Sequence, residues 1–146
     1  PERTLAEIAR CFRPGARLAW SAWCPGGWPG AWRRLLGAAL DRPPRPFPVE
    51  FGVEAAARSA MTSAGFVDVT VEHHVATWRA IDVAGLVDEI VAAAGGLRPL
   101  RDLAESTGRW PQGEAVLHAD SHHRSRSDDS GVAIDDHLLV IAGHLP

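Results

Sequence analysis

Three tryptophans near the start of the chain are the residues best suited to binding chemistry. Trp23, Trp28 and Trp32 lie close together in the sequence, around a Pro-Gly-Gly bend. Aromatic side chains form walls that suit a flat or apolar small molecule and exclude water. The sequence therefore predicts that these three residues bind a small-molecule substrate. The alternative is that they only cover the edge of a sheet and the helix behind it.

Histidines offer two other kinds of chemistry. His73 and His74 lie in an alternating segment, where either could act as a general base, although such histidines are more often exposed or hydrogen-bonded side chains. Segment 118–123 holds an aspartate and three histidines, two of them at the i, i+4 spacing that can bind zinc on a helix. The glutamate of an H-E-x-x-H motif is absent and the cysteines are remote, which favours a solvated helix end. We assign no catalytic residue and predict no metal site, and a metal-binding protein is the weakest alternative.

The hydrophobic pattern predicts the elements that hold the tryptophans. Apolar residues at i, i+3, i+4 and i+7 predict a helix over 5–12, which Pro14 and Gly15 end. Segment 18–23 is almost free of charge, as is typical of a strand covered on both faces. Trp28 and Trp32 then share one face of a second helix.

Later segments predict two further strands. A helix over 53–64 ends at Gly65, and segment 66–78 alternates between apolar and polar residues. Its valines, Val67, Val69, Val71 and Val75, point to one side, which predicts a strand with one wet face. Segment 138–142 is apolar at every position and predicts a strand covered on both faces.

The remaining segments predict helices and a connector. Segment 41–48 holds four prolines and must be extended. Asp82 is a predicted N-cap for a helix that stops before a glycine pair, and a second helix covers 97–106. A third helix starts near Pro111 and fades in the polar run 121–130.

One segment of the chain carries a family resemblance. Residues 5–18 read LAEIARCFRPGARL. This segment resembles the L-x-E-x-x-R-V-L-R-P-G-G-R-L motif of the class I S-adenosylmethionine-dependent methyltransferases, which lies just before and within their fifth strand. Residues 64–66 are similar to the A-G-F ahead of the sixth strand, and residues 136–143 are similar to the last strand. Ala16 departs from the motif at its second glycine.

The resemblance implies an α/β fold, a partial Rossmann-like class I methyltransferase sheet. It covers nearly the whole chain but only the C-terminal half of the family's domain, strands five to seven. The expected division is 1–81 for strands five and six with their helices, 82–135 for a helical insertion, and 136–146 for the last strand. That last strand is expected to lie antiparallel between the other two, with the sixth strand at the edge.

The resemblance also implies methyl transfer from S-adenosylmethionine to a small-molecule acceptor, as part of a longer enzyme. The glycine-rich turn and the acidic residue that bind the cofactor in this family are absent from the sequence, so no residue is assigned to the cofactor. We expect the first four strands upstream and the isolated chain to be inactive. The alternative is a non-catalytic half-domain that pairs with another chain, or with a second copy, through the exposed edge of strand 18–23.

Composition limits the class of protein further. The chain has 146 residues, 46% of them hydrophobic, enough for one modest domain. A net charge of -3 gives no reason to expect nucleic acid or an anionic membrane as partner. The two cysteines fit a reducing compartment, and no apolar run is long enough to span a bilayer. We therefore expect a cytoplasmic protein.

Overall fold

The computed structural model describes residues 2–42 and 49–146, which form two compact units. The first unit contains residues 2–25, 49–75 and 137–146, and the second contains residues 26–42 and 76–136. Two long strands contribute to both, because their sequences cross the boundary at residues 75 and 137. The division over 1–81, 82–135 and 136–146 stays a prediction.

The first unit opens with the helix and turn that the sequence predicts. Helix α1 spans Glu2–Cys11, and Gly15 has a left-handed φ of 79° in the turn before strand β1, Arg17–Trp23. A left-handed backbone at this point favours glycine because it has no Cβ. Both the helix end and the strand are confirmed.

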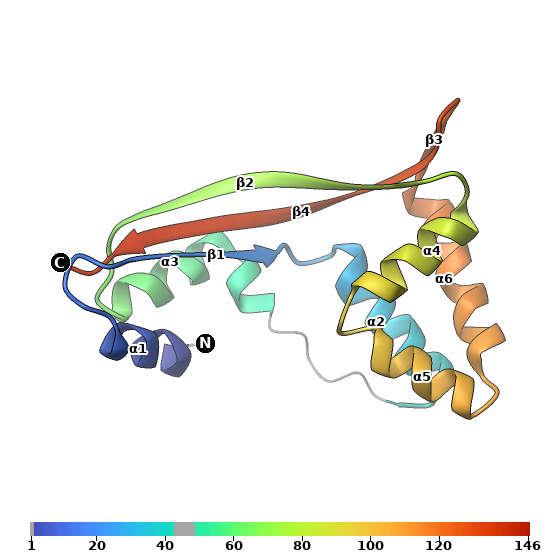
Figure 1. Ribbon diagram of the computed structural model, residues 1–146, viewed down its shortest axis with the longest axis horizontal. Helices are drawn as coiled ribbons and strands as arrows, with labels where there is room; N and C mark the ends of the chain where they lie inside the picture. Colours follow the sequence, from blue (N-terminus) through green and yellow to red (C-terminus); the bar gives the residue numbers. More distant parts are fainter. Residues whose placement is uncertain (1, 43–48) are drawn as a thin grey trace. The chain divides into compact units, whose positions relative to one another are not determined.

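The last strand of the chain lies between the two earlier ones. Strand β2 spans Val67–Ala80 and strand β4 spans Gly131–His144. The sheet order is β1-β4-β2, and β4 is antiparallel to β1, with Arg17 opposite His144 and Trp23 opposite Leu138 (Figure 1). The predicted position and direction of segment 136–143 beside segment 18–23 are confirmed.

Helices cover one face of this unit's sheet. Helix α3, Glu54–Ser63, follows the short helix η1, Val49–Gly52, and lies on the same side of the sheet as α1 (Figure 1). Leu139 and Ile141 of β4 are fully buried there, together with Met61 and Phe66. The buried residues of this core, in order, are Leu5, Ala57, Ala60, Met61, Phe66, Leu139 and Ile141.

The prediction that strands 18–23 and 138–142 are covered on both faces is wrong for the described residues. Arg17, Ala19 and Ser21 are exposed, and the residues of β4 that alternate with Leu139 and Ile141 are only half-buried. The helices of the described part of this unit pack on the opposite face. The two apolar runs therefore do form strands, but the described residues cover only one face of each strand.

Strand β2 keeps its polar face but buries fewer valines than predicted. Val69 and Val71 are half-buried against the core of the first unit, whereas Val67 and Val75 are 40% and 56% exposed. The strand lies at the end of the sheet order, so it has a neighbour on one side among the described residues. In the second unit, Trp78 packs on a different, helical core.

Four helices build the core of the second unit. They are α2 (Trp28–Ala39), α4 (Val83–Ala93), α5 (Arg98–Ser106) and α6 (Trp110–Arg124). Asp82 caps α4 as predicted, because its carboxylate accepts a 2.8 Å hydrogen bond from the backbone amide of Gly85. The fully buried Trp32, Leu36, Leu86, Ile90 and Leu117 form the centre of this core. Most of the predicted extended connector, residues 43–48, lies outside the described residues.

The polar run 121–130 is not simply a fading helix. Helix α6 ends at Arg124, and strand β3, Arg126–Asp128, then pairs antiparallel with the start of β4. Strand β4 accordingly begins at Gly131, before the predicted start at residue 136. No helix in the described part of the chain is both long and apolar enough to cross a membrane.

Candidate functional site

The three predicted substrate-binding tryptophans fall in both units. Trp23 ends β1 in the first unit and is half-buried. Trp28 and Trp32, on α2 in the second unit, are 3% and 0% exposed and belong to its core. Their packing role is therefore evident from burial, while the substrate role of all three stays a prediction.

A third tryptophan joins the pair on α2. The ring of Trp28 lies 5.4 Å from that of Trp32 and 5.7 Å from that of Trp78, which meets it edge to face. Edge-to-face contacts are a preferred geometry for aromatic rings and stabilise such clusters. Trp78 was not among the predicted site residues. The alternating pattern of the sequence places Trp78 on a strand. Its contact with α2 cannot be predicted from the sequence, because it depends on the tertiary fold.

The carboxylate of Asp120 on helix α6 binds this cluster directly. Through Arg124 it is also linked to the turn that precedes α2. Oδ2 of Asp120 accepts hydrogen bonds from Nε1 of Trp32, at 2.9 Å, and from Nε of Arg124, at 2.7 Å. Nη1 of Arg124 also donates to the carbonyl oxygen of Gly26, at 3.3 Å. The side chain of Asp120 is only 17% exposed. A pair of this kind fixes orientations more firmly than an exposed ion pair does.

A second carboxylate lies at the start of α2. Asp136 is 3% exposed and faces Gly27, the N-cap residue of the helix. A Cβ on Gly27 would lie 2.6 Å from Oδ2 of Asp136 and closer still to Oδ1. A carboxylate near a helix N-terminus is favoured by the partial positive charge of the amides there. Glycine is therefore required at position 27 by space, since its φ of -65° suits any residue.

This arrangement does not fit S-adenosylmethionine. In nucleotide-binding folds, glycines after a strand leave room for the ligand and a helix N-terminus faces it. Here the room beside Gly27 is filled by the Asp136 carboxylate. Among the described residues we find no glycine-rich turn with a following acidic residue that would hold the cofactor, so we derive no step through it.

The histidines take up surface positions. Nε2 of His73 lies 3.0 Å from Oε2 of Glu54, which also pairs with Arg58. The hydrogen bond from His73 is the main reason why the pKa of Glu54 falls below its usual value, and Arg58 lowers it further. His74 lies 3.2 Å from Glu72. Both imidazoles are at least half exposed, and each lies beside an exposed carboxylate.

The segment 118–123 does not form a metal centre in the structure. In the described part of the chain, no group of three or more histidine, cysteine or acidic side chains is arranged to hold a metal ion. Asp120, the acidic residue of that segment, is engaged by Trp32 and Arg124 instead. Its two donors lie on different helices, α2 and α6, which pack against each other.

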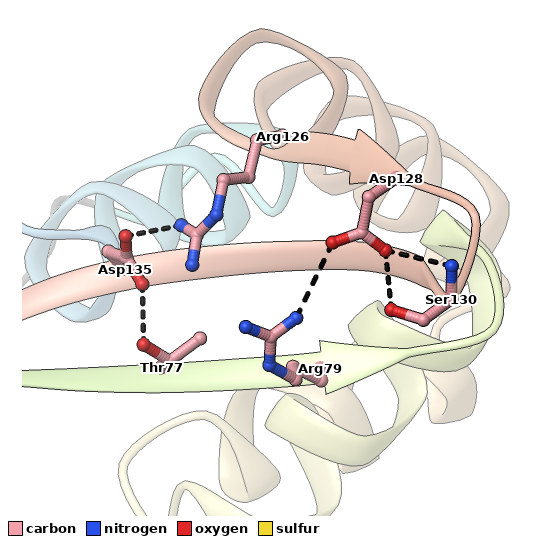
Figure 2. Close-up of polar contacts among 6 residues, drawn as sticks. All are labelled: Thr77, Arg79, Arg126, Asp128, Ser130 and Asp135. Atoms are coloured by element: carbon pink, nitrogen blue, oxygen red, sulfur yellow. Dashed lines mark hydrogen bonds and ion pairs between the residues drawn. The ribbon is translucent and has the colours of Figure 1, made fainter.

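A polar network crosses the second-unit parts of strands β2, β3 and β4. Oδ1 of Asp135 on β4 accepts a 2.6 Å hydrogen bond from the hydroxyl of Thr77 on β2, and Oδ2 pairs with Arg126 on β3 (Figure 2). The hydrogen bond from Thr77, followed by that from Arg126, lowers the pKa of Asp135 below its usual value. The three strands are thus joined by side chains as well as by backbone pairing.

Asp128 forms the second half of this network. Its carboxylate accepts hydrogen bonds from the hydroxyl and the backbone amide of Ser130, and it lies 3.7 Å from Nη1 of Arg79 (Figure 2). The bonds from Ser130 are the largest cause of the lowered pKa of Asp128. They close the turn between β3 and β4.

Comparison with known proteins adds little beyond the geometry. No protein-family model matches the chain, and no curated protein matches it. One solved structure that resembles it is described as a putative methyltransferase from Bacillus halodurans C-125, with 12% sequence identity and a TM-score of 0.49. The alignment covers all of this chain and 58% of the other, so this chain spans less than two thirds of that protein. What the structure itself shows is a mixed α/β fold whose sheet is mostly antiparallel.

Proposed function

We propose that the chain is the C-terminal half of a class I methyltransferase, which transfers a methyl group from S-adenosylmethionine to a small-molecule acceptor. The observation that carries the proposal is the position of β4 between β1 and β2, antiparallel to β1. The resemblance of residues 5–18 implies this order before any coordinates are considered. Sequence motif and strand order therefore support the same assignment independently.

The proposal gives this chain the acceptor side of the enzyme. Methyl transfer from a sulfonium needs donor and acceptor held in line, in a site with little water. In open α/β sheets, ligands bind beyond the carboxyl ends of the strands. The segment that leaves β1 at that end is 23–28, and Gly26 and Gly27 within it are held by α6 and by Asp136. Trp23, half-buried at the end of β1, would supply an apolar surface there.

Two measurements test the proposal. Isothermal titration of the isolated chain with S-adenosylmethionine should give no binding, because the glycine-rich turn and the acidic residue that hold the cofactor in this family are absent from the sequence. A protein extended by the residues encoded upstream should bind the cofactor and release S-adenosylhomocysteine when offered aromatic or apolar acceptors. Micromolar binding of S-adenosylmethionine by the isolated chain would contradict the proposal that the cofactor site lies outside this chain. Failure of the extended protein to bind the cofactor at all would contradict the enzyme class.

One observation favours a second candidate function, a half-domain that pairs with another chain. Strand β1 lies at the end of the sheet order, and one of its faces is exposed. Unpaired strand edges recruit partners or aggregate. Size-exclusion chromatography with light scattering separates the two functions. A defined dimer or complex supports pairing as the function, whereas irregular aggregation supports a fragment that lacks its neighbouring strand.

A further inference from the structure

The turn at Gly26 and Gly27 is held from two directions within the second unit. Gly26 has a left-handed φ of 89°, and its carbonyl oxygen accepts a hydrogen bond from Arg124 of α6. Gly27 packs directly against the carboxylate of Asp136 on β4. A short glycine pair would otherwise sample many backbone conformations. Its conformation is therefore set by residues far away in the sequence.

Arg124 can hold the turn because it is itself held. Its Nε donates to Asp120 one helical turn earlier, and the same carboxylate oxygen accepts from Nε1 of the fully buried Trp32. The guanidinium thus has one fixed anchor and uses a second nitrogen, Nη1, to reach Gly26. The planar fork of arginine makes two such directed bonds, which the single ammonium of lysine cannot reproduce in the same geometry.

An ion pair on α5 provides the comparison in the same unit, because its arginine is about as exposed as Arg124 but has other partners. Arg101 pairs with Glu105 at the same i, i+4 spacing, at 2.8 Å, and is 31% exposed, against 33% for Arg124. Its carboxylate partner, however, is 48% exposed, against 17% for Asp120. Arg101 lies over the ring of Trp110 and does not contact the Gly26–Gly27 turn. The two arginines therefore differ chiefly in their further partner, which is the carbonyl oxygen of Gly26 for Arg124 and the ring of Trp110 for Arg101.

We infer that Asp120 and Arg124 are positioning residues that fix the Gly26–Gly27 turn for the acceptor side of the site. This inference rests on the proposed function for its purpose, but its geometry stands on the contacts alone. Asp120 orients Arg124 and Trp32 together, so one carboxylate links helix α6, helix α2 and the turn that precedes α2. Neither residue touches the reacting atoms in this assignment.

The experiment is native-state cleavage of the full 146-residue chain by proteinase K, a protease of broad specificity that can cut within the turn, with the cut sites mapped by mass spectrometry. Cleavage of a folded protein follows the population of the locally open state when reclosing is fast. Arg124→Ala should raise the cleavage rate within 23–28 about tenfold, the effect expected from one charge-assisted hydrogen bond. Arg124→Lys should give an intermediate rate. The matched control Arg101→Ala should leave this rate within about twofold of the original.

A spectroscopic signal tests the anchor separately. The indole N–H resonance of Trp32 should shift in Asp120→Asn, because the carboxylate that accepts its hydrogen bond becomes a neutral amide, and should shift far less in Arg124→Ala. Cleavage of Arg124→Ala at the original rate would overturn the inference, as would an equal acceleration by Arg101→Ala. If Arg124→Ala fails to fold, the cleavage rate of Arg124→Lys tests the inference instead, and an unchanged rate would overturn it. Neither readout needs methyl transfer, so failure here is distinct from failure of the proposed function.

Discussion

At the scale of single residues, Gly27 and Asp136 lie so close together that a side chain on Gly27 would overlap the carboxylate. A buried carboxylate placed against an N-cap glycine gains from the helix N-terminus and leaves no room for a side chain. The pair joins residues that are remote in sequence, one on β4 and one before α2. The resemblance marks Asp136 only as the start of the last strand, and the sequence predicts a bend, or alternatively a lid hinge, for the two glycines. Nothing in the sequence pairs the two residues.

Gly27→Ala should destabilise the chain by about 1–3 kcal/mol, because the new methyl group overlaps the Asp136 carboxylate. Gly30→Ala, on the same helix, is the matched control. A Cβ there would lie 3.5 Å from the flexible end of Arg34, so the substitution should stabilise the helix by about 0.5–1 kcal/mol. Urea denaturation measures the free energy of unfolding of both variants. A change of the same sign in the two variants would contradict the steric role given to Gly27.

At the scale of elements, local signals in the sequence predict starts and ends well. The left-handed turn at Gly15, the turn at Gly65 and the Asp82 cap lie where the sequence predicts them, because each depends on a few adjacent residues. Strand β3 was missed because a short polar segment carries no period of its own. It exists through its pairing with β4 and the side-chain bonds of Arg126 and Asp128.

The network on these strands should make stability depend on pH. The pKa of Asp135 in the folded chain is lowered from its ordinary value of 3.8, first by Thr77 and then by Arg126. A lowered folded pKa means that the charged form favours folding. The contribution is present above pH 3.8 and is lost as the pH falls through the lower folded value.

Asp135→Asn should therefore lower the urea midpoint at neutral pH, and its difference from the original chain should shrink as the solution is acidified below 3.8. The effect is small because the side chain is 38% exposed. Thr77→Val should reduce the same pH dependence, since it removes the donor that lowers the pKa most. Asp129→Asn, which makes no ion pair with the described residues, is the control. A difference that persists unchanged in acid would contradict this explanation.

At the scale of the whole molecule, the sequence predicts the strand order but not the extent of burial. The resemblance implies that segment 136–143 lies between 18–23 and 66–78, and β1-β4-β2 has this order. Burial on the second face of a strand depends on which helices are present to cover it. Val140 and Ser21 pair across β4 and β1 on a face that the described helices leave open. An apolar run alone cannot reveal this.

That open face and the edge of β1 should make the isolated chain associate. Protective edges usually carry lysine, proline or a bulge, whereas β1 has a single charge, at Arg17, its first residue. Ser21→Lys places a charge in the exposed middle of the strand and should shift the chain towards the monomer in light scattering. Ser106→Lys adds the same charge at the exposed end of α5 and serves as the control for net charge, which moves closer to zero in both variants. Equal association of the two variants would mean that β1 is not the contact surface, and a monomeric original chain would contradict the expected association.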